Sequence, residues 1–202
     1  MSAEAARLVG EFVALRPLRP EDAPITHEWR KSARARLLNV GAPDIEAQER
    51  WIASRPDSER NEIIETLDGH PLGMLSLIDV DPTHRHAETA RFLIGDEEAA
   101  KGIPAAVEAM KLLYQLAFDE LGLVRIYGTV AESNARMIKW QRYLGMVEEG
   151  RLRQHLFIDG TWQDAVCLGL LVDEYRNVTL PRMNALIAAA RHPRGPEIAR
   201  EA

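Results

Sequence analysis

The chain has 202 residues, of which 46% are hydrophobic and 28% charged, and its formal net charge is −6. This length is enough for one ordinary domain with a sizeable core. The acidic balance argues against a nucleic-acid-binding domain, which would usually show a basic face, and no stretch approaches the roughly 20 apolar residues needed to cross a bilayer.

Cysteine usage and the N-terminus indicate the compartment. The single cysteine, Cys167, lies in an apolar run, so no internal disulfide can form and a reducing environment fits. The first residues contain no apolar stretch of signal-peptide length. We therefore expect a cytoplasmic protein with Cys167 in the core of a strand.

The first half of the chain predicts two helices among strands. Residues 12–18 alternate like a strand, and PEDAPITHEWRKS (20–32) has the composition of a helix start. In APDIEAQERWIASR (42–55), Asp44 is the expected N-cap of a second helix. Residues 61–67 and 72–80 predict a hairpin that turns at Asp68 and Gly69, and residues 87–94 predict a third antiparallel strand.

The second half predicts a long helix, a strand, a short helix and a hairpin. From residue 103 to 121 apolar residues recur at intervals of three and four, and Gly122 ends the helix. Residues 123–131 predict a strand, Ser133 is the expected cap of a helix that ends at Gly145, and residues 146–172 predict a hairpin. Beyond it we expect a short helix after Pro181 and a disordered tail over 192–202.

Several strings resemble the GNAT superfamily of acetyl-CoA-dependent N-acetyltransferases. They are RHAETARFLIGDEEAAKGIPAAVEAM, AFDELGL, ESN, LGM and EEGRL, in that order. HEWR and RWIASR resemble members that acetylate nucleotide-linked amino sugars, while RHAE and EGRL also occur in polyamine and ribosomal-protein branches. The resemblance implies an α/β GNAT fold over residues 8–172, with a mixed, mostly antiparallel central sheet flanked by helices, and a C-terminal extension over 173–202.

The loop GDEEAAKGIP (95–104) before the long helix is a candidate phosphate cradle. The first N–H groups of a helix lack internal partners, Gly102 lets a ligand approach closely, and Lys101 adds a cation. An ordinary helix start that binds nothing is the alternative. In the family this loop wraps the cofactor pyrophosphate with an Arg/Gln-x-x-Gly-x-Gly/Ala pattern, of which only Gly102 matches, since Ala99 and Pro104 depart from it.

The resemblance implies acetyl-CoA as the co-substrate. Its expected contacts are Leu93, Ile94, Ala99, Ala100, Lys101, Gly102, Ile103, Ala105, Asn134 and Ile138. Asn134 would contact the pantetheine arm; a second capping residue beside Ser133 is the alternative.

N-acetylation needs an amine that has lost its proton, donors for the oxyanion, and an acid for the departing thiolate. By resemblance, Glu88 is the candidate base, acting through a water; an ion pair with Arg85 or Arg91, or a solvated face, is the alternative. The family's usual tyrosine acid is replaced by Gln141. Tyr143, two residues further and about 200° around the helix, is the remaining candidate acid.

The acceptor side carries three further candidates. By resemblance Trp29 and Arg30 border the acceptor site, with packing as the alternative for Trp29. His84 and His86 share a strand face, and His86 is assigned to the substrate side. Since no third ligand is evident, no metal is expected.

The sequence thus predicts an enzyme that moves acetyl from acetyl-CoA to a primary amine by direct attack, with a nucleotide-linked amino sugar as the first choice of acceptor. A protein N-terminus or a polyamine is the alternative acceptor. A degenerate domain that serves as a non-catalytic CoA-binding or interaction module is the alternative class. No nucleic-acid or membrane partner is expected. The apolar positions Leu180, Met183, Leu186 and Ile187 predict docking on the same domain or on a second subunit, as in a homodimer.

Overall fold

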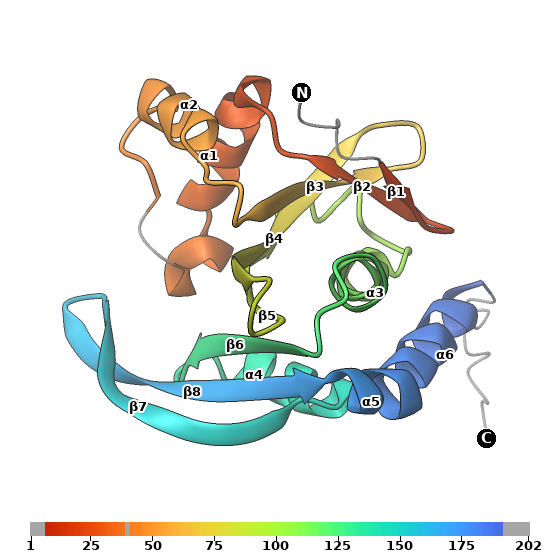
Figure 1. Ribbon diagram of the computed structural model, residues 1–202. Coiled ribbons are helices and arrows are strands. Elements are labelled where there is room, and N and C mark those ends of the chain that lie inside the picture. Colours follow the sequence, from red (N-terminus) through yellow and green to blue (C-terminus); the bar gives the residue numbers. More distant parts are fainter. Residues whose placement is uncertain (1–6, 39–40, 192–202) are drawn as a thin grey trace, which may run out of the picture.

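The structure is a computed structural model that describes residues 7–38 and 41–191 (Figure 1). Eight strands form one sheet in the order β1-β2-β3-β4-β5-β6-β8-β7. The strands are β1 (Leu8–Val9), β2 (Val13–Pro17), β3 (Arg60–Thr66), β4 (Pro71–Asp81), β5 (His86–Ile94), β6 (Arg125–Ala131), β7 (Val147–Ile158) and β8 (Thr161–Leu171). Every neighbouring pair is antiparallel except β5 and β6, which run parallel.

The helices complete a mixed α/β domain. They are α1 (Ala23–Lys31), α2 (Ile45–Ala53), α3 (Ala105–Gln115), α4 (Ala135–Leu144), α5 (Val172–Glu174) and α6 (Leu180–Ala190), with the short helical turns η1 (Pro20–Asp22), η2 (Ala33–Leu37), η3 (Leu116–Glu120) and η4 (Tyr175–Thr179). In Figure 1 the β1–β4 part of the sheet lies above and the β6–β8 part below, with β5 between them and α3 seen end-on in the angle. This confirms the predicted fold class.

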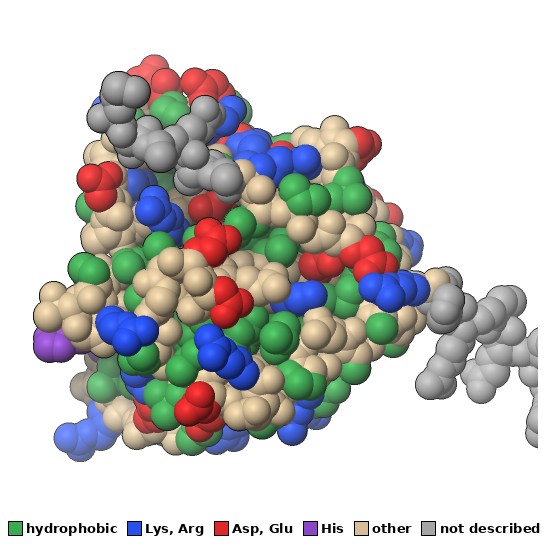
Figure 2. All heavy atoms as spheres, turned by 45° about the vertical axis from the view of Figure 1, so that its right-hand side comes forward, with side chains coloured by type: hydrophobic (Ala, Val, Ile, Leu, Met, Phe, Trp, Pro, Cys, Tyr) green, Lys and Arg blue, Asp and Glu red, His purple; other side chains and the backbone are tan. Residues whose placement is uncertain are grey.

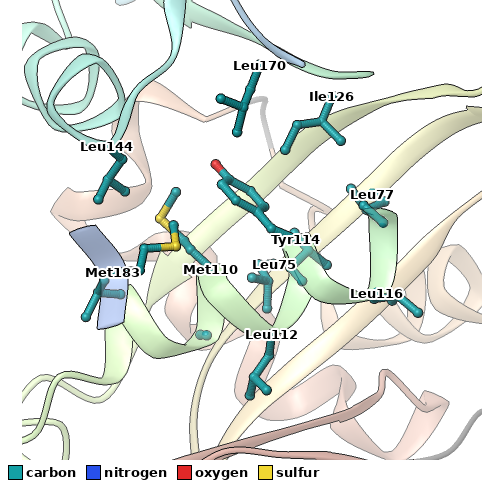
Figure 3. Close-up of a cluster of buried hydrophobic side chains, with 14 of the residues drawn as sticks. Leu75, Leu77, Met110, Leu112, Tyr114, Leu116, Ile126, Leu144, Leu170 and Met183 are labelled. Carbon is teal, nitrogen blue, oxygen red and sulfur yellow. The ribbon is translucent and has the colours of Figure 1, made fainter. Parts of the chain in front are cut away.

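Helix α3 is central to the core, because the side chains of its apolar face are buried in the main hydrophobic cluster. Figure 3 shows the Tyr114 side chain pointing toward Leu170 of β8 and Ile126 of β6. Tyr114 is 1% exposed, and burial raises the pKa of its hydroxyl. The helix is also tied to the sheet edge, since the buried Glu108 carboxylate accepts the N–H groups of Glu11, Phe12 and Val13 at 2.7 to 2.9 Å.

Local signals predicted most elements correctly. Asp44 caps α2, with its Oδ1 accepting the N–H of Ala47 at 2.7 Å, and Gly145 ends α4 in the left-handed conformation at φ 117°. The predicted cap of α4 was wrong. The cap is Asn134, whose Oδ1 accepts the N–H of Met137 at 3.3 Å, while the hydroxyl of Ser133 instead donates to Gln163.

The C-terminal region is more helical than the sequence predicted. Helical structure begins at Val172, well before Pro181, and continues through η4 to Ala190. Met183 and Ile187 are buried in the same cluster as α3, and Leu180 and Leu186 pack against it. The apolar stripe therefore docks on its own domain. The tail predicted over 192–202 lies outside the described residues.

The surface shows no gathering of one charge on the face in Figure 2, where acidic and basic side chains lie interspersed among hydrophobic ones. The described helices include none with the length and apolarity that spanning a membrane requires. An anionic ligand would therefore depend on the individual polar and charged groups next to its binding site.

Candidate active site

The sheet opens between its two parallel strands. β5 and β6 pair over only three positions, His86 with Arg125 through Glu88 with Tyr127. Beyond them β5 continues along β4 to Ile94, while β6 continues along β8 to Ala131. The two facing strand edges therefore diverge, and an extended molecule with amide groups can lie between them.

Glu88 lies where the strands diverge. Its Oε1 accepts the backbone N–H of Thr129 across the opening at 3.2 Å. Burial raises the pKa of this carboxyl, and the nearby Asp79 carboxylate raises it further. Both alternative ion-pair partners are engaged elsewhere: Arg85 donates to the carbonyl of Gly122, and Arg91 pairs with Glu59.

The face that carries Glu88 is polar and partly acidic. Tyr127 is the register partner of Glu88, so both side chains leave the same face of the sheet. Burial raises the pKa of the Tyr127 hydroxyl, as do the Glu88 and Asp79 carboxylates. Asp79 reaches this face from a bulge in β4, where its φ is 50°. His86 packs edge-on against the Tyr127 ring at 5.8 Å.

A second bulge distorts β5 just beyond the point of divergence. The register with β4 shifts between Ser76 and Met74, and Arg91 adopts a φ of 57°. Its guanidinium is held by Glu59 and Asn61 at 2.8 Å and lies 5.0 Å from the centre of the Trp51 ring. Bulges of this kind re-aim backbone groups next to active sites.

The loop before α3 uses several of its amides internally. The N–H groups of Ala99, Ala100, Lys101 and Ile103 donate to Asp96 Oδ1, Asp96 O, Glu98 O and Ala100 O, respectively. The amides available to an anion are thus those of Gly102 and of the first turn of α3, from Ala105 onward. Gly102 has a φ of 82°, and a Cβ added there would meet nothing within 4 Å.

The charge of this loop is mixed. Lys101 is 77% exposed and lies 3.9 Å from Glu98. Asp96 is hydrogen-bonded by the Ala99 amide and by His70, which hold its pKa below the usual value. The loop therefore offers an anion backbone N–H groups and one flexible cation rather than a fixed basic pocket.

The remaining predicted cofactor contacts lie around the same opening. Ile94 and Ile103 pack against the main core, as does Ile138 of α4, whereas the Leu93 side chain is buried in a second cluster with Trp29 and Met74. Leu93 and Ile94 can therefore offer mainly their backbone to a ligand. Asn134 caps α4, so its Oδ1 is already used.

Two predicted site residues are not brought into the opening. Trp29 is 6% exposed and packs on Gly95, where an added Cβ would overlap the indole. Its position fits the packing alternative, and its substrate role stays a prediction. Tyr143 is 50% exposed, stacks on Trp140 and lies near Arg182 of α6, and its acid role stays a prediction.

Arg30 and the histidines have different surroundings. Arg30 is partly buried, and burial together with the charge of Arg91 lowers the pKa of its guanidinium. His84 stacks on His86 at 6.2 Å. No group of three metal-ligating side chains occurs within residues 7–38 and 41–191. Cys167 is partly exposed on β8, opposite Thr129, rather than in the core.

Sequence reasoning missed Tyr127, Asp79 and Thr129. The alternation of β6 could have placed Tyr127 on one face, but its pairing with Glu88 depends on a parallel register that no local signal encodes. Asp79 reaches the site through a bulge with a left-handed residue, which the sequence does not mark.

Comparison with known proteins identifies the class that this fold and site define. A family model described as the acetyltransferase (GNAT) domain matches residues 13–147, and the chain belongs to this family. Members of the family use acetyl-CoA.

Several relatives have names that specify an acceptor. The spermidine N(1)-acetyltransferase of Escherichia coli strain K12 is 28% identical over 166 residues, which cover 81% of this chain and 88% of the relative. The enzyme of the same name from Vibrio cholerae serotype O1 is 31% identical over 121 residues, 60% of this chain and 68% of the relative.

Solved structures agree in fold. A putative acetyltransferase from T. thermophilus is 28% identical, has a TM-score of 0.74 and covers 93% of this chain and 100% of its own. A spermidine N-acetyltransferase variant from Vibrio cholerae has a TM-score of 0.71 at 24% identity, covering 82% of this chain and 96% of its own, and shows likeness of fold.

Proposed function

We propose that this chain transfers the acetyl group of acetyl-CoA to a primary amine of a small, cationic acceptor of the polyamine class. The observation that carries the proposal is Glu88, a half-buried carboxylate with a raised pKa, anchored on the Thr129 amide where β5 and β6 diverge. Glu88 is a base at the place where an acetyl donor bound between the strands would meet an amine acceptor bound on the polar face.

The residues around the opening suit an elongated acyl donor. The edges of β5 and β6 beyond their three shared positions can bind a chain of amides. The amides of Gly102 and the first turn of α3 can receive its phosphates, with Lys101 close by. Acetyl-CoA supplies the activated acetyl group; the protein supplies position, a base and backbone donors.

Glu88 then removes the proton that the amine must lose. An ammonium with a pKa near 10 is mostly protonated at neutral pH, so a carboxylate with a raised pKa is a better acceptor for its proton, directly or through a water. The oxyanion formed on attack would be stabilised by backbone N–H groups of the distorted segment of β5 near Arg91.

The polar face favours a cationic acceptor. Glu88 and Asp79 place two carboxylates beside the Tyr127 ring, which together attract ammonium groups. The names of two relatives point the same way, since they specify spermidine. Nothing in the comparisons supports the nucleotide-linked amino sugar that the sequence favoured, so the polyamine alternative takes its place.

Initial rates with spermidine, a nucleotide-linked amino sugar and a peptide with a free N-terminus, measured as thiol release from acetyl-CoA, test the assignment. Spermidine is expected to give the highest kcat/KM. In the Glu88→Gln variant, kcat is expected to fall by about 100-fold or more, as for loss of a general base. The rise of wild-type activity with pH, as Glu88 loses its proton, should also disappear.

Asp57→Asn is the matched control, because Asp57 is an exposed acidic residue in the turn between α2 and β3. It should leave both kcat and the pH profile unchanged. Turnover with the amino sugar but not with spermidine would reject the acceptor class. Full activity of Glu88→Gln would reject the base.

A further inference from the structure

Gln141 is a buried polar side chain that the fold leaves incompletely satisfied. It lies on α4 and is 7% exposed, and its Oε1 has no hydrogen-bond partner among the described residues. Burying an amide oxygen without a hydrogen-bond partner destabilises the folded state. A residue that only filled space would be expected to be apolar.

The carboxamide lies under the point where the two strands diverge. Its Nε2 is 3.8 Å from the position that a Cβ would occupy at Gly128 of β6, and Thr89 of β5 bounds the same spot. Gly128 and Thr89 each follow the last pair of the shared register, Tyr127 and Glu88. Side chains alternate along a strand, so Gly128 and Thr89 face the core side of the sheet and Glu88 faces the other side. Gln141 lies next to Gly128 and is therefore on the core side of the opening.

The reactive end of an acyl donor would reach this spot. If its phosphates lie at the start of α3, just after β5, its arm runs back along β5 toward the point of divergence. From Ile94 to Glu88 this path is about 20 Å at the rise of a strand. The thioester would therefore lie between Glu88 on one face and Gln141 on the other.

We propose that Gln141 binds the sulfur end of the acyl donor and stabilises the departing thiolate by hydrogen bonding without giving it a proton. This rests on the function proposed above. The Nε2–H group donates to the sulfur, and the unpaired Oε1 accepts the amide N–H that follows the sulfur two methylene groups along the donor.

The step balances without a protein acid. The amine nitrogen bonds to the thioester carbonyl carbon, the C–S bond breaks, and its electron pair stays on the sulfur. Glu88 takes the proton that the ammonium loses before attack and releases it to solvent, and it then takes the second proton that the nitrogen loses as the amide forms. The thiolate leaves with Gln141 hydrogen-bonded to it and takes a proton from solvent. A carboxamide suits this role because it stays neutral at every working pH and is both donor and acceptor.

The test compares the Tm and the kcat of Gln141→Leu with those of the wild type. If Gln141 had only a structural role, both values would fall. Removing an unsatisfied buried amide should raise the Tm of the ligand-free protein by about 2–4 °C. Loss of the donor to the sulfur should lower kcat by about 10- to 100-fold, with a smaller change in the KM for acetyl-CoA. Stability and turnover are thus expected to change in opposite directions.

Gln48→Leu is the matched control, because Gln48 is an equally buried glutamine whose Nε2 donates to Thr26 Oγ1 at 3.1 Å. Its Tm should fall while kcat stays the same. If Gln141→Leu keeps wild-type kcat, or loses kcat and Tm together, the inference is overturned and the proposed function stands. If the wild type turns over no amine with acetyl-CoA, both fall.

Discussion

At the scale of single residues, burial decides which carboxylates are unusual. Glu88 and Glu62 both have raised pKa values because burial penalises the charged form. Glu88 lies at the opening, where a ligand can use its basicity. Glu62 lies in the middle of β3 at 5% exposure, paired in register with Pro17 and Leu75, and has no comparable access. The same physical effect therefore supports the proposed base at one position and costs stability at the other.

Glu62 gives a prediction about stability and pH. Burial raises its pKa to about 7 in the folded protein from the ordinary value of 4.5, against the lowering effect of Arg60 and Arg16. Because the folded pKa is the higher one, its contribution to stability is present below the unfolded pKa and is lost as pH rises through 7. From pH 5 to pH 8, urea unfolding should therefore show Glu62→Gln gaining about 2–3 kcal/mol relative to wild type.

Glu65→Gln is the matched control in the same strand. Glu65 is also buried but is paired with Arg7 at 2.7 Å and Arg16 at 2.9 Å. Its substitution breaks ion pairs and should destabilise the protein at both pH values. A constant difference between Glu62→Gln and wild type across this range would show that Glu62 does not titrate there.

At the scale of elements, helix α6 is part of the core. Met183 is fully buried and Ile187 is 3% exposed, both in contact with the cluster around α3. In Figure 3, Met183 lies beside Met110 and below Leu144. The extension beyond β8 therefore contributes to the stability of the domain that carries the site.

Met183→Ala tests this contribution. It should lower the free energy of unfolding by about 2–5 kcal/mol, the range for truncation of a large buried side chain. Asn184→Ala, one residue away and exposed, should change it by less than about 0.5 kcal/mol. Equal small effects of the two substitutions in chemical denaturation would contradict the docking of α6.

At the scale of the whole molecule, the two parts of the sheet share few backbone bonds. β5 and β6 pair at three positions, whereas β6 and β8 pair at seven. A ligand between β5 and β6 would touch both parts and so stabilise the whole fold. Its phosphates would rely on backbone amides, because the chain as a whole carries a net charge of −6.

Acetyl-CoA should therefore raise the Tm. At 100 times its Kd the ligand would add about 2.7 kcal/mol to the free energy of unfolding, if it binds only the folded state. Gly102→Trp should abolish the shift by covering the amides at the start of α3. Gly69→Trp is the matched control, since Gly69 also has a positive φ, at 93°, with nothing within 4 Å of an added Cβ. Equal shifts in both variants would place the phosphates elsewhere.

Much of the fold could be predicted because its signals are local. The Asp44 cap, the turn at Asp68 and Gly69, and the apolar spacing of α3 each depend on residues close in sequence. The angle between Gln141 and Tyr143 on a helix likewise predicted that both could not face the same site, and the structure places Gln141 inside and Tyr143 outside. The prediction of Ser133 rather than Asn134 as the cap of α4 was wrong, because either side chain can cap a helix.

The sequence by itself determined the succession of elements, the family and the identity of Glu88 as the candidate base. Tertiary structure alone decided that Trp29 packs on Gly95, that Tyr127 stands beside Glu88, and that α6 closes the core. It also decided which amides of the α3 loop remain for a ligand. The reason is physical: caps and periodicity act over a few residues, whereas burial, strand register and unpaired polar atoms depend on segments far apart in the chain.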